Sequence, residues 1–140
     1  MLNQAYRNHF DEEVLNASPL KFVDLLYRGT LDSIASARRY LRLGDIRARS
    51  FAISKAMGII TELSLSLNQH EGGELSRNLA DLYGYVQMLL IKANSLQCDP
   101  PLEEAERLLA ILAEAWESCA QAAAAPVSYQ ETYEPVSQAY

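Results

Sequence analysis

Four long segments of this chain repeat apolar residues with the period of an α-helix, and proline or glycine stands between them. The segments cover about 19–43, 45–67, 74–94 and 99–125. No stretch alternates apolar and polar residues for long enough to indicate a β-strand. Long helices with short connections fold as antiparallel up-down-up-down bundles. We therefore predict an all-α four-helix bundle over residues 18–125.

The ends of the first two segments carry specific helix signals. Ser18 can cap a helix through its side-chain oxygen, and Pro19 fits the first helical position. Gly44 favours the left-handed backbone that ends a helix, and Asp45 is a cap residue for the next one. These signals predict a first helix from Pro19 to Leu43 and a short turn to the second.

Each predicted helix has one apolar stripe when its residues are placed on a wheel at about 100° per residue. The stripes predicted to form the core in the first two helices are Leu20, Val23, Tyr27, Ile34, Leu41, Ile46, Ile53, Ile60 and Leu67, with Met57 and Leu63 beside them. In the last two helices they are Leu75, Leu79, Leu82, Val86, Leu89, Ala93, Leu102, Ala105, Leu108, Leu109, Leu112, Trp116 and Cys119.

The first three helices also carry a second apolar stripe, away from the first. Its members are Phe22, Leu25, Gly29, Tyr40, Phe51, Gly58, Leu65, Gly84, Met88 and Ile91, to which we add Tyr83. A glycine within a helix is destabilising by about 1 kcal/mol relative to alanine, but it lets another backbone come close. Two interpretations follow. The stripes are peripheral core of a skewed bundle, or they form a surface that receives another apolar helix.

The two ends of the chain differ from the bundle segments. Tyr6 and Phe10 follow Leu2 at a spacing of four, so residues 1–17 are predicted to form a short helical segment that docks on exposed apolar surface of the bundle. Residues 126–140 contain two prolines and no helical stripe, which predicts a flexible tail.

Charge is divided unevenly along a chain of net charge −6. Residues 19–66 hold eight Lys or Arg and four Asp or Glu, whereas residues 67–140 hold three and eleven, so we expect the two halves to pack on each other. Five arginines gather between Arg38 and Arg49. This cluster is a solvated helix end, a docking site for an acidic partner, or the binding surface of a small nucleic-acid-binding or regulatory protein, although specific nucleic-acid binding favours a basic domain.

Other functional classes have little support in the sequence. No apolar run is long enough to span a membrane, the N-terminus lacks signal-peptide features, and two cysteines make no framework, so a reduced cytoplasmic setting is expected. His9 and His70 lie outside the predicted long helices, and no phosphate-binding glycine loop is present. We expect no enzymatic activity, no cofactor and no metal site.

Four segments together resemble the flagellar secretion chaperone family FliS: "ASPLKFVDLLYRG", "GDIRARSFAISKAMGIITELSLSLN", "GGELSRNLADLYGYVQMLLIKAN" and "LEEAERLLAILAEAW". The resemblance covers about residues 6–117, and only Arg28 and Gly84 stand where the family usually has an acidic residue. It implies a cytoplasmic helical bundle that binds the C-terminal helices of flagellin and assists their delivery to the flagellar export gate. It implies partners of that kind rather than nucleic acid or membrane.

Overall fold

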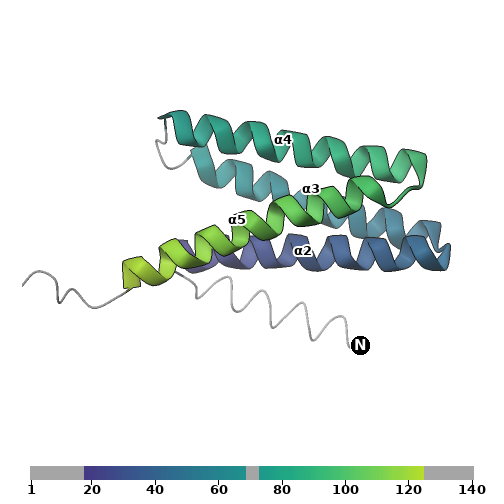
Figure 1. The fold of residues 1–140 in the computed structure, drawn as a ribbon, viewed down its shortest axis with the longest axis horizontal. Helices are drawn as coiled ribbons and strands as arrows, with labels where there is room; N and C mark the ends of the chain where they lie inside the picture. The colour runs from purple at the N-terminus through teal and green to yellow at the C-terminus, as the bar shows by residue number, and fades with distance from the viewer. Residues whose placement is uncertain (1–17, 69–72, 125–140) are drawn as a thin grey trace, which may run out of the picture.

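The computed structural model describes residues 18–68 and 73–124, which form four α-helices (Figure 1). α2 spans Pro19–Leu43, α3 spans Ile46–Asn68, α4 spans Gly73–Leu96 and α5 spans Pro100–Ala124. Consecutive helices run in opposite directions, and each packs against the next, with α5 returning to α2. The prediction of an all-α, up-down-up-down four-helix bundle is confirmed for these residues. The segments predicted for 1–17 and 126–140 lie outside the described residues.

The helix ends follow from local chemistry that the sequence displays. The Ser18 hydroxyl accepts a hydrogen bond from the Lys21 backbone N–H at 3.2 Å and so caps α2. Gly44 ends this helix with φ of 74°, a left-handed conformation that glycine adopts without strain. The Asp45 carboxylate then accepts from the Ala48 N–H at 3.0 Å and caps α3.

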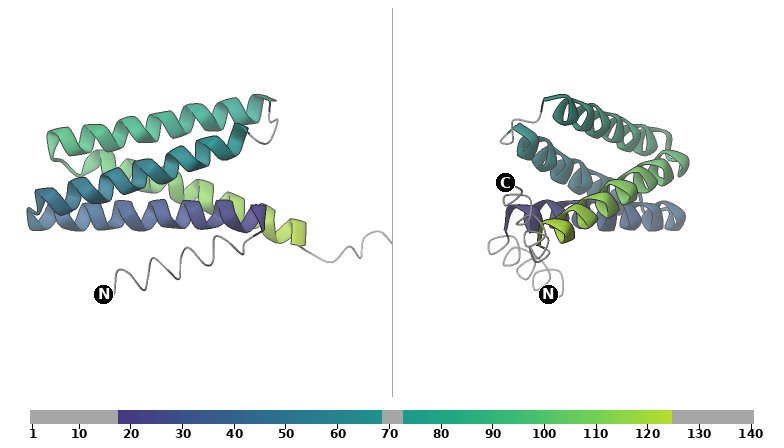
Figure 2. Two further views of the ribbon diagram at one scale, coloured as in Figure 1. Left: turned by 180° about the vertical axis from the view of Figure 1, so that it is seen from behind. Right: turned by 60° about the vertical axis from the view of Figure 1, so that its left-hand side comes forward.

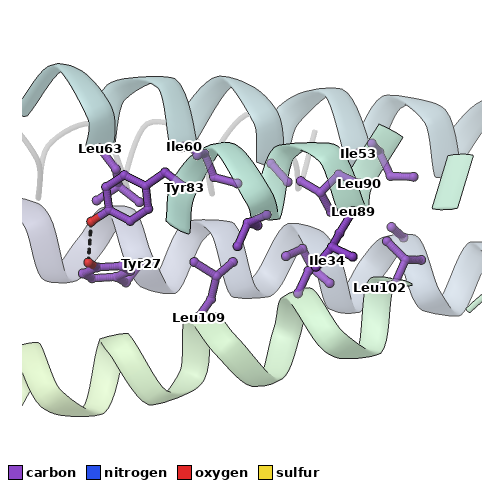
Figure 3. Packing of buried hydrophobic residues seen from close by; sticks show 14 of the residues in the cluster. Tyr27, Ile34, Ile53, Ile60, Leu63, Tyr83, Leu89, Leu90, Leu102 and Leu109 are labelled. Carbon is purple, nitrogen blue, oxygen red and sulfur yellow. Dashed lines mark hydrogen bonds between the residues drawn. The ribbon is translucent and has the colours of Figure 1, made fainter. Parts of the chain in front are cut away.

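The core runs along the bundle axis and receives side chains from all four helices (Figure 3). Ile34 of α2, Ile60 of α3, Leu90 of α4 and Leu102 of α5 are fully buried. A fully buried aliphatic side chain contributes about 1.5–3 kcal/mol through removal of its surface from water. These layers are the main source of the bundle's stability.

Some residues predicted to lie in the core are exposed. Leu20, Ile46 and Leu75 lie in the first turn of their helices and are 40%, 56% and 68% exposed, and Cys119 near the end of α5 is exposed as well. The helices cross at an angle and diverge toward some of their ends (Figure 2). The periodic stripe continues to the helix terminus, but the neighbouring helices do not cover it there.

Other residues that the predicted core stripes omitted are buried. Leu26 on α2, Ala52 and Ala56 on α3 and Leu90 on α4 all belong to the central cluster. Each helix of the bundle has two neighbours, so its buried arc is wider than a single stripe.

Charged groups join the basic and acidic halves of the chain. The Arg38 guanidinium of α2 donates two hydrogen bonds of 2.8 Å to the Asp99 carboxylate and one of 2.7 Å to Glu106 on α5. These hydrogen bonds hold the pKa of Asp99 below its ordinary value. The expectation that the two halves pack on each other is confirmed at this contact.

Candidate functional site: an exposed apolar face on α3 and α4

The outward side of α3 carries large apolar side chains in water. Phe51 is 73% exposed and Leu65 is 49% exposed, and Gly58 lies midway between them. These three residues are spaced by seven, which returns to nearly the same direction on a helix. Ile53 and Ile60, which are 3% and 0% exposed, lie on the opposite side. The second stripe predicted for this helix is therefore a solvent-exposed stripe.

The outward side of α4 has the same character. Met88 is 52% exposed and Ile91 is 53% exposed, and Gly84 is exposed one turn before Met88. Val86 and Leu89 on the other side of this helix are buried in the core. Both second stripes thus point away from the bundle interior.

A polar contact joins the two stripes. The Gln87 amide nitrogen of α4 donates to the Met57 backbone oxygen and lies within hydrogen-bond distance of the Thr61 hydroxyl, both at 3.3 Å. Gln87 lies between Gly84 and Met88 in sequence, and Gly58 lies in the turn of α3 that Gln87 contacts. We call the six residues of the two stripes the α3–α4 outer face: Phe51, Gly58, Leu65, Gly84, Met88 and Ile91.

Gln87 was not among the predicted site residues. Its only signal in the sequence is a polar side chain one residue before Met88, at a position that faces the neighbouring helix. The amide links α4 to the middle of α3, between the two stripes.

Neither glycine of the outer face is required by packing within the chain. A Cβ atom added at Gly58 or at Gly84 would meet no atom within 4 Å, and neither residue has a positive φ. An alanine would therefore fit at both positions and would favour the helix by about 1 kcal/mol. The two glycines leave the backbone of each helix uncovered on this face.

The second stripe of α2 differs from those of α3 and α4. Leu25 is only 3% exposed, whereas Phe22 and Tyr40 are half-buried and pack against the core, and Gly29 is half-buried as well. Of the four helices, α2 packs most extensively against its two neighbours, α3 and α5, so residues outside its central stripe are covered. On α2 the burial favours the peripheral-core interpretation, and contact of these residues with a partner stays a prediction.

Tyr83, also predicted to contact a partner, lies inside the bundle. It is 2% exposed, and its hydroxyl lies 2.6 Å from that of Tyr27 (Figure 3). Burial raises the pKa of both phenols above the ordinary value. Tyr27 also contacts the Trp116 ring, whose indole N–H donates to the Leu20 carbonyl at 2.9 Å. This cluster supports the fold and presents no hydroxyl on the outer face.

Tyr6 and Phe10, the remaining predicted contact residues, lie outside the described residues. Their place relative to the α3–α4 outer face stays a prediction from the sequence.

The arginine cluster is partly used inside the bundle. Arg38 is held by Asp99 and Glu106, and Arg49 is only 3% exposed, with its Nε donating to the Asn94 side chain at 3.1 Å. Arg38 is therefore engaged by carboxylates within the bundle, and most of the Arg49 side chain is covered. This arrangement weakens the nucleic-acid alternative, which depended on the cluster as a whole.

The described part of the chain contains no group of three or more His, Cys, Asp or Glu side chains that could hold a metal ion. None of the helices in that part is both long and apolar enough to cross a membrane. The chemistry that the outer face offers is contact with another apolar surface.

Comparisons with known proteins identify the family. The family model described as "Flagellar protein FliS" matches residues 1–123. The chain is 37% identical over 123 residues to the flagellar secretion chaperone FliS of Salmonella typhimurium, which covers 87% of this chain and 88% of the relative. It is 32% identical over 116 residues to the flagellar secretion chaperone FliSB of Pseudomonas aeruginosa, with 83% and 92% covered. This chain therefore belongs to the FliS family of flagellar secretion chaperones.

Proposed function

We propose that this protein binds the C-terminal helical region of newly made flagellin in the cytoplasm. In this role it keeps the flagellin helices from polymerising early and helps to deliver them to the flagellar export gate. Membership of the flagellar secretion chaperone family supports this proposal. The terminal helices of a filament subunit are apolar because they bury each other in the filament, so before export they need a substitute partner.

The observation that carries the proposal is the exposure of four large apolar side chains on one side of α3 and α4. Phe51, Leu65, Met88 and Ile91 are each about half exposed or more. Single exposed apolar residues are ordinary, but a set on two neighbouring helices is typical of a surface that binds a partner. An amphipathic partner helix buries such side chains along its own apolar stripe.

The two glycines of the outer face support a helical partner in particular. Gly58 and Gly84 have no tight contact within the chain, although each is unfavourable in a helix. A partner that lies over them can bring its backbone or its own side chains close to the backbone of α3 and α4. The glycines then serve the complex rather than the free bundle.

Calorimetric titration of the full chain with the flagellin C-terminal region tests the proposal. We expect one flagellin segment for each chaperone chain and a negative heat-capacity change, because apolar surface is buried on binding. Flagellin that lacks its C-terminal region is the matched control and should give no binding heat. Equal binding of both flagellin forms, or no binding of either, would contradict the proposal.

A further inference from the structure

Arg49 is a buried cation without an anionic partner among the described residues. It is 3% exposed, and the one hydrogen bond of its side chain to a described residue runs from Nε to the Asn94 side-chain oxygen at 3.1 Å. A buried guanidinium is normally paired with a carboxylate, because removing an unpaired charge from water is costly. Arg38 on the neighbouring helix α2 has such partners, because it forms ion pairs with Asp99 and Glu106.

The amide of Asn94 adds further donors beside Arg49. The Nε of Arg49 can only donate, so the Asn94 oxygen must face it, and this oxygen also accepts from the Ser50 hydroxyl at 3.2 Å. The Asn94 nitrogen is therefore directed away from both groups. No described residue accepts a hydrogen bond from it or from the two terminal nitrogens of Arg49.

These donor atoms are within reach of solvent. No fully buried side-chain nitrogen or oxygen of the described, non-exposed residues lacks a hydrogen-bond partner. Neither Arg49 nor Asn94 is an exposed residue, so this finding applies to both. The two terminal nitrogens of Arg49 and the side-chain nitrogen of Asn94 have no partner among the described residues, and each therefore keeps some contact with solvent. The side chain of Arg49 is thus buried along its length, and its terminal nitrogens keep a small contact with solvent.

The site lies at one end of the bundle, where α3 begins and α4 ends (Figure 1). The exposed Arg47 stands on the first turn of α3, and Arg42 on the last turn of α2. Asp45 caps α3 and Asp99 binds Arg38, and neither carboxylate pairs with Arg49. Arg49 itself stands on the first turn of α3, where the helix dipole also favours a negatively charged ligand.

We propose that Arg49 and Asn94 form a binding site for one oxyanion. The guanidinium edge offers two parallel N–H donors, which match the two oxygens of a carboxylate or a phosphate, and the Asn94 oxygen holds the guanidinium in place through Nε. A guanidinium has only N–H donors, so it binds groups whose oxygens accept hydrogen bonds, such as a carboxylate or a phosphate. The site is distinct from the α3–α4 outer face and does not depend on flagellin binding.

Titration of the full chain with sodium phosphate, followed by NMR of the Arg49 Nε–H and Asn94 side-chain amide signals, tests the site directly. We expect both signals to shift saturably, while side-chain amide signals elsewhere, such as that of Gln87, stay in place. Unchanged Arg49 and Asn94 signals up to the highest soluble phosphate concentration would show that solvent alone serves these donors.

Thermal unfolding of variants supplies an independent measurement. At a phosphate concentration about ten times its Kd, the Tm of the unmodified chain should rise by about 4 °C. Phosphate also stabilises proteins without binding, so Arg47→Met is the control for a lost surface arginine. Arg49→Met should lose the saturable part of the rise, and Arg47→Met should keep it. An equal rise in all three proteins contradicts the proposal. If Arg49→Met does not fold, the NMR titration of the unmodified chain decides alone.

The same titration with sodium acetate distinguishes two sources of the oxyanion. Tighter binding of acetate supports the site and identifies an acidic side chain of a protein as its ligand. Tighter binding of phosphate also supports the site and identifies a phosphate group instead.

Discussion

The hydroxyl groups of Tyr27 and Tyr83 lie 2.6 Å apart inside the bundle, and their hydrogen bond joins α2 to α4. These two helices are diagonal in the bundle, since each packs against α3 and α5. The bond is therefore a direct polar link across the core. The two rings are also inclined by 61° in an edge-to-face contact, with their centroids 6.4 Å apart.

Removing both hydroxyls should cost less stability than the sum of the two single removals. Tyr83→Phe leaves the Tyr27 hydroxyl buried without a partner, and we expect a loss of about 1–2 kcal/mol in the free energy of unfolding. The double variant Tyr27→Phe, Tyr83→Phe leaves no unpaired group and should lose less than the sum of the two single variants. Urea unfolding of the four proteins measures this difference. Strict additivity would mean that the two hydroxyls do not stabilise each other.

The same pair predicts a loss of stability at alkaline pH. Burial raises the pKa of both phenols, so the folded chain keeps these protons at a pH where the unfolded chain releases them. The stabilising contribution is complete below the unfolded tyrosine pKa of about 10 and is lost as pH rises above it. Urea unfolding from about pH 8 to pH 11 should show this fall. The double phenylalanine variant should show a smaller fall, and an identical fall would assign it to other groups.

The Arg38–Asp99 pair predicts the opposite behaviour in acid. Hydrogen bonds from Arg38 lower the pKa of Asp99, so this contribution is present above the unfolded Asp pKa of about 3.9 and is lost as pH falls through the lower folded value. Asp99→Asn should reduce the free energy of unfolding at neutral pH by about 1 kcal/mol, a modest value because the side chain is 36% exposed. Glu103→Gln is the control, since its oxygen lies 3.7 Å from Arg38 and is more exposed. Equal losses in the two variants would show that the bidentate geometry has no special role.

The sequence predicted the helix bounds to within two residues because the determinants are local. Ser18 and Gly44 act through their own backbone neighbours, and such effects can be read without knowing the fold. The extent of the core was less predictable. Leu75 continues a good apolar stripe yet is 68% exposed, because the angle at which helices cross depends on packing between distant segments.

The exposed face was predictable on α3 and α4 but not on α2. Phe51 and Leu25 have the same apparent position on their wheels, away from the main stripe, yet one is 73% and the other 3% exposed. The difference in their exposed fractions comes from the arrangement of the neighbouring helices, which the wheel does not show. Arg49 could not be identified at all, because nothing in the pattern distinguishes a buried arginine from the four others near it.

Charge placed on the α3–α4 outer face should weaken flagellin binding. Phe51→Asp, Leu65→Asp and Met88→Asp each introduce a carboxylate that a bound apolar helix would bury without a partner. We expect each variant to lose more than about 1 kcal/mol of binding free energy while its Tm stays nearly unchanged, since the residues are exposed in the free protein. Calorimetry and thermal unfolding of the same samples measure both quantities.

The matched control for these variants is Ile111→Asp. Ile111 is 58% exposed, as much as the residues of the outer face, but it belongs to α5. Its substitution should leave binding intact if contact with flagellin is confined to α3 and α4. Normal binding by all three outer-face variants would show that this face is not the site.

The glycines of the outer face allow stability and binding to be separated. Gly58→Ala and Gly84→Ala each add a methyl group that meets nothing within 4 Å, so each should raise the free energy of unfolding by about 0.5–1 kcal/mol. A partner helix that lies close to either glycine meets that methyl group, and its affinity should then fall even though the chaperone is more stable. Urea unfolding and flagellin titration of each variant give the two values. A gain in stability with unchanged affinity at both positions would place the partner's closest approach elsewhere on the bundle, since a helix in contact with the bare backbone cannot avoid the added group.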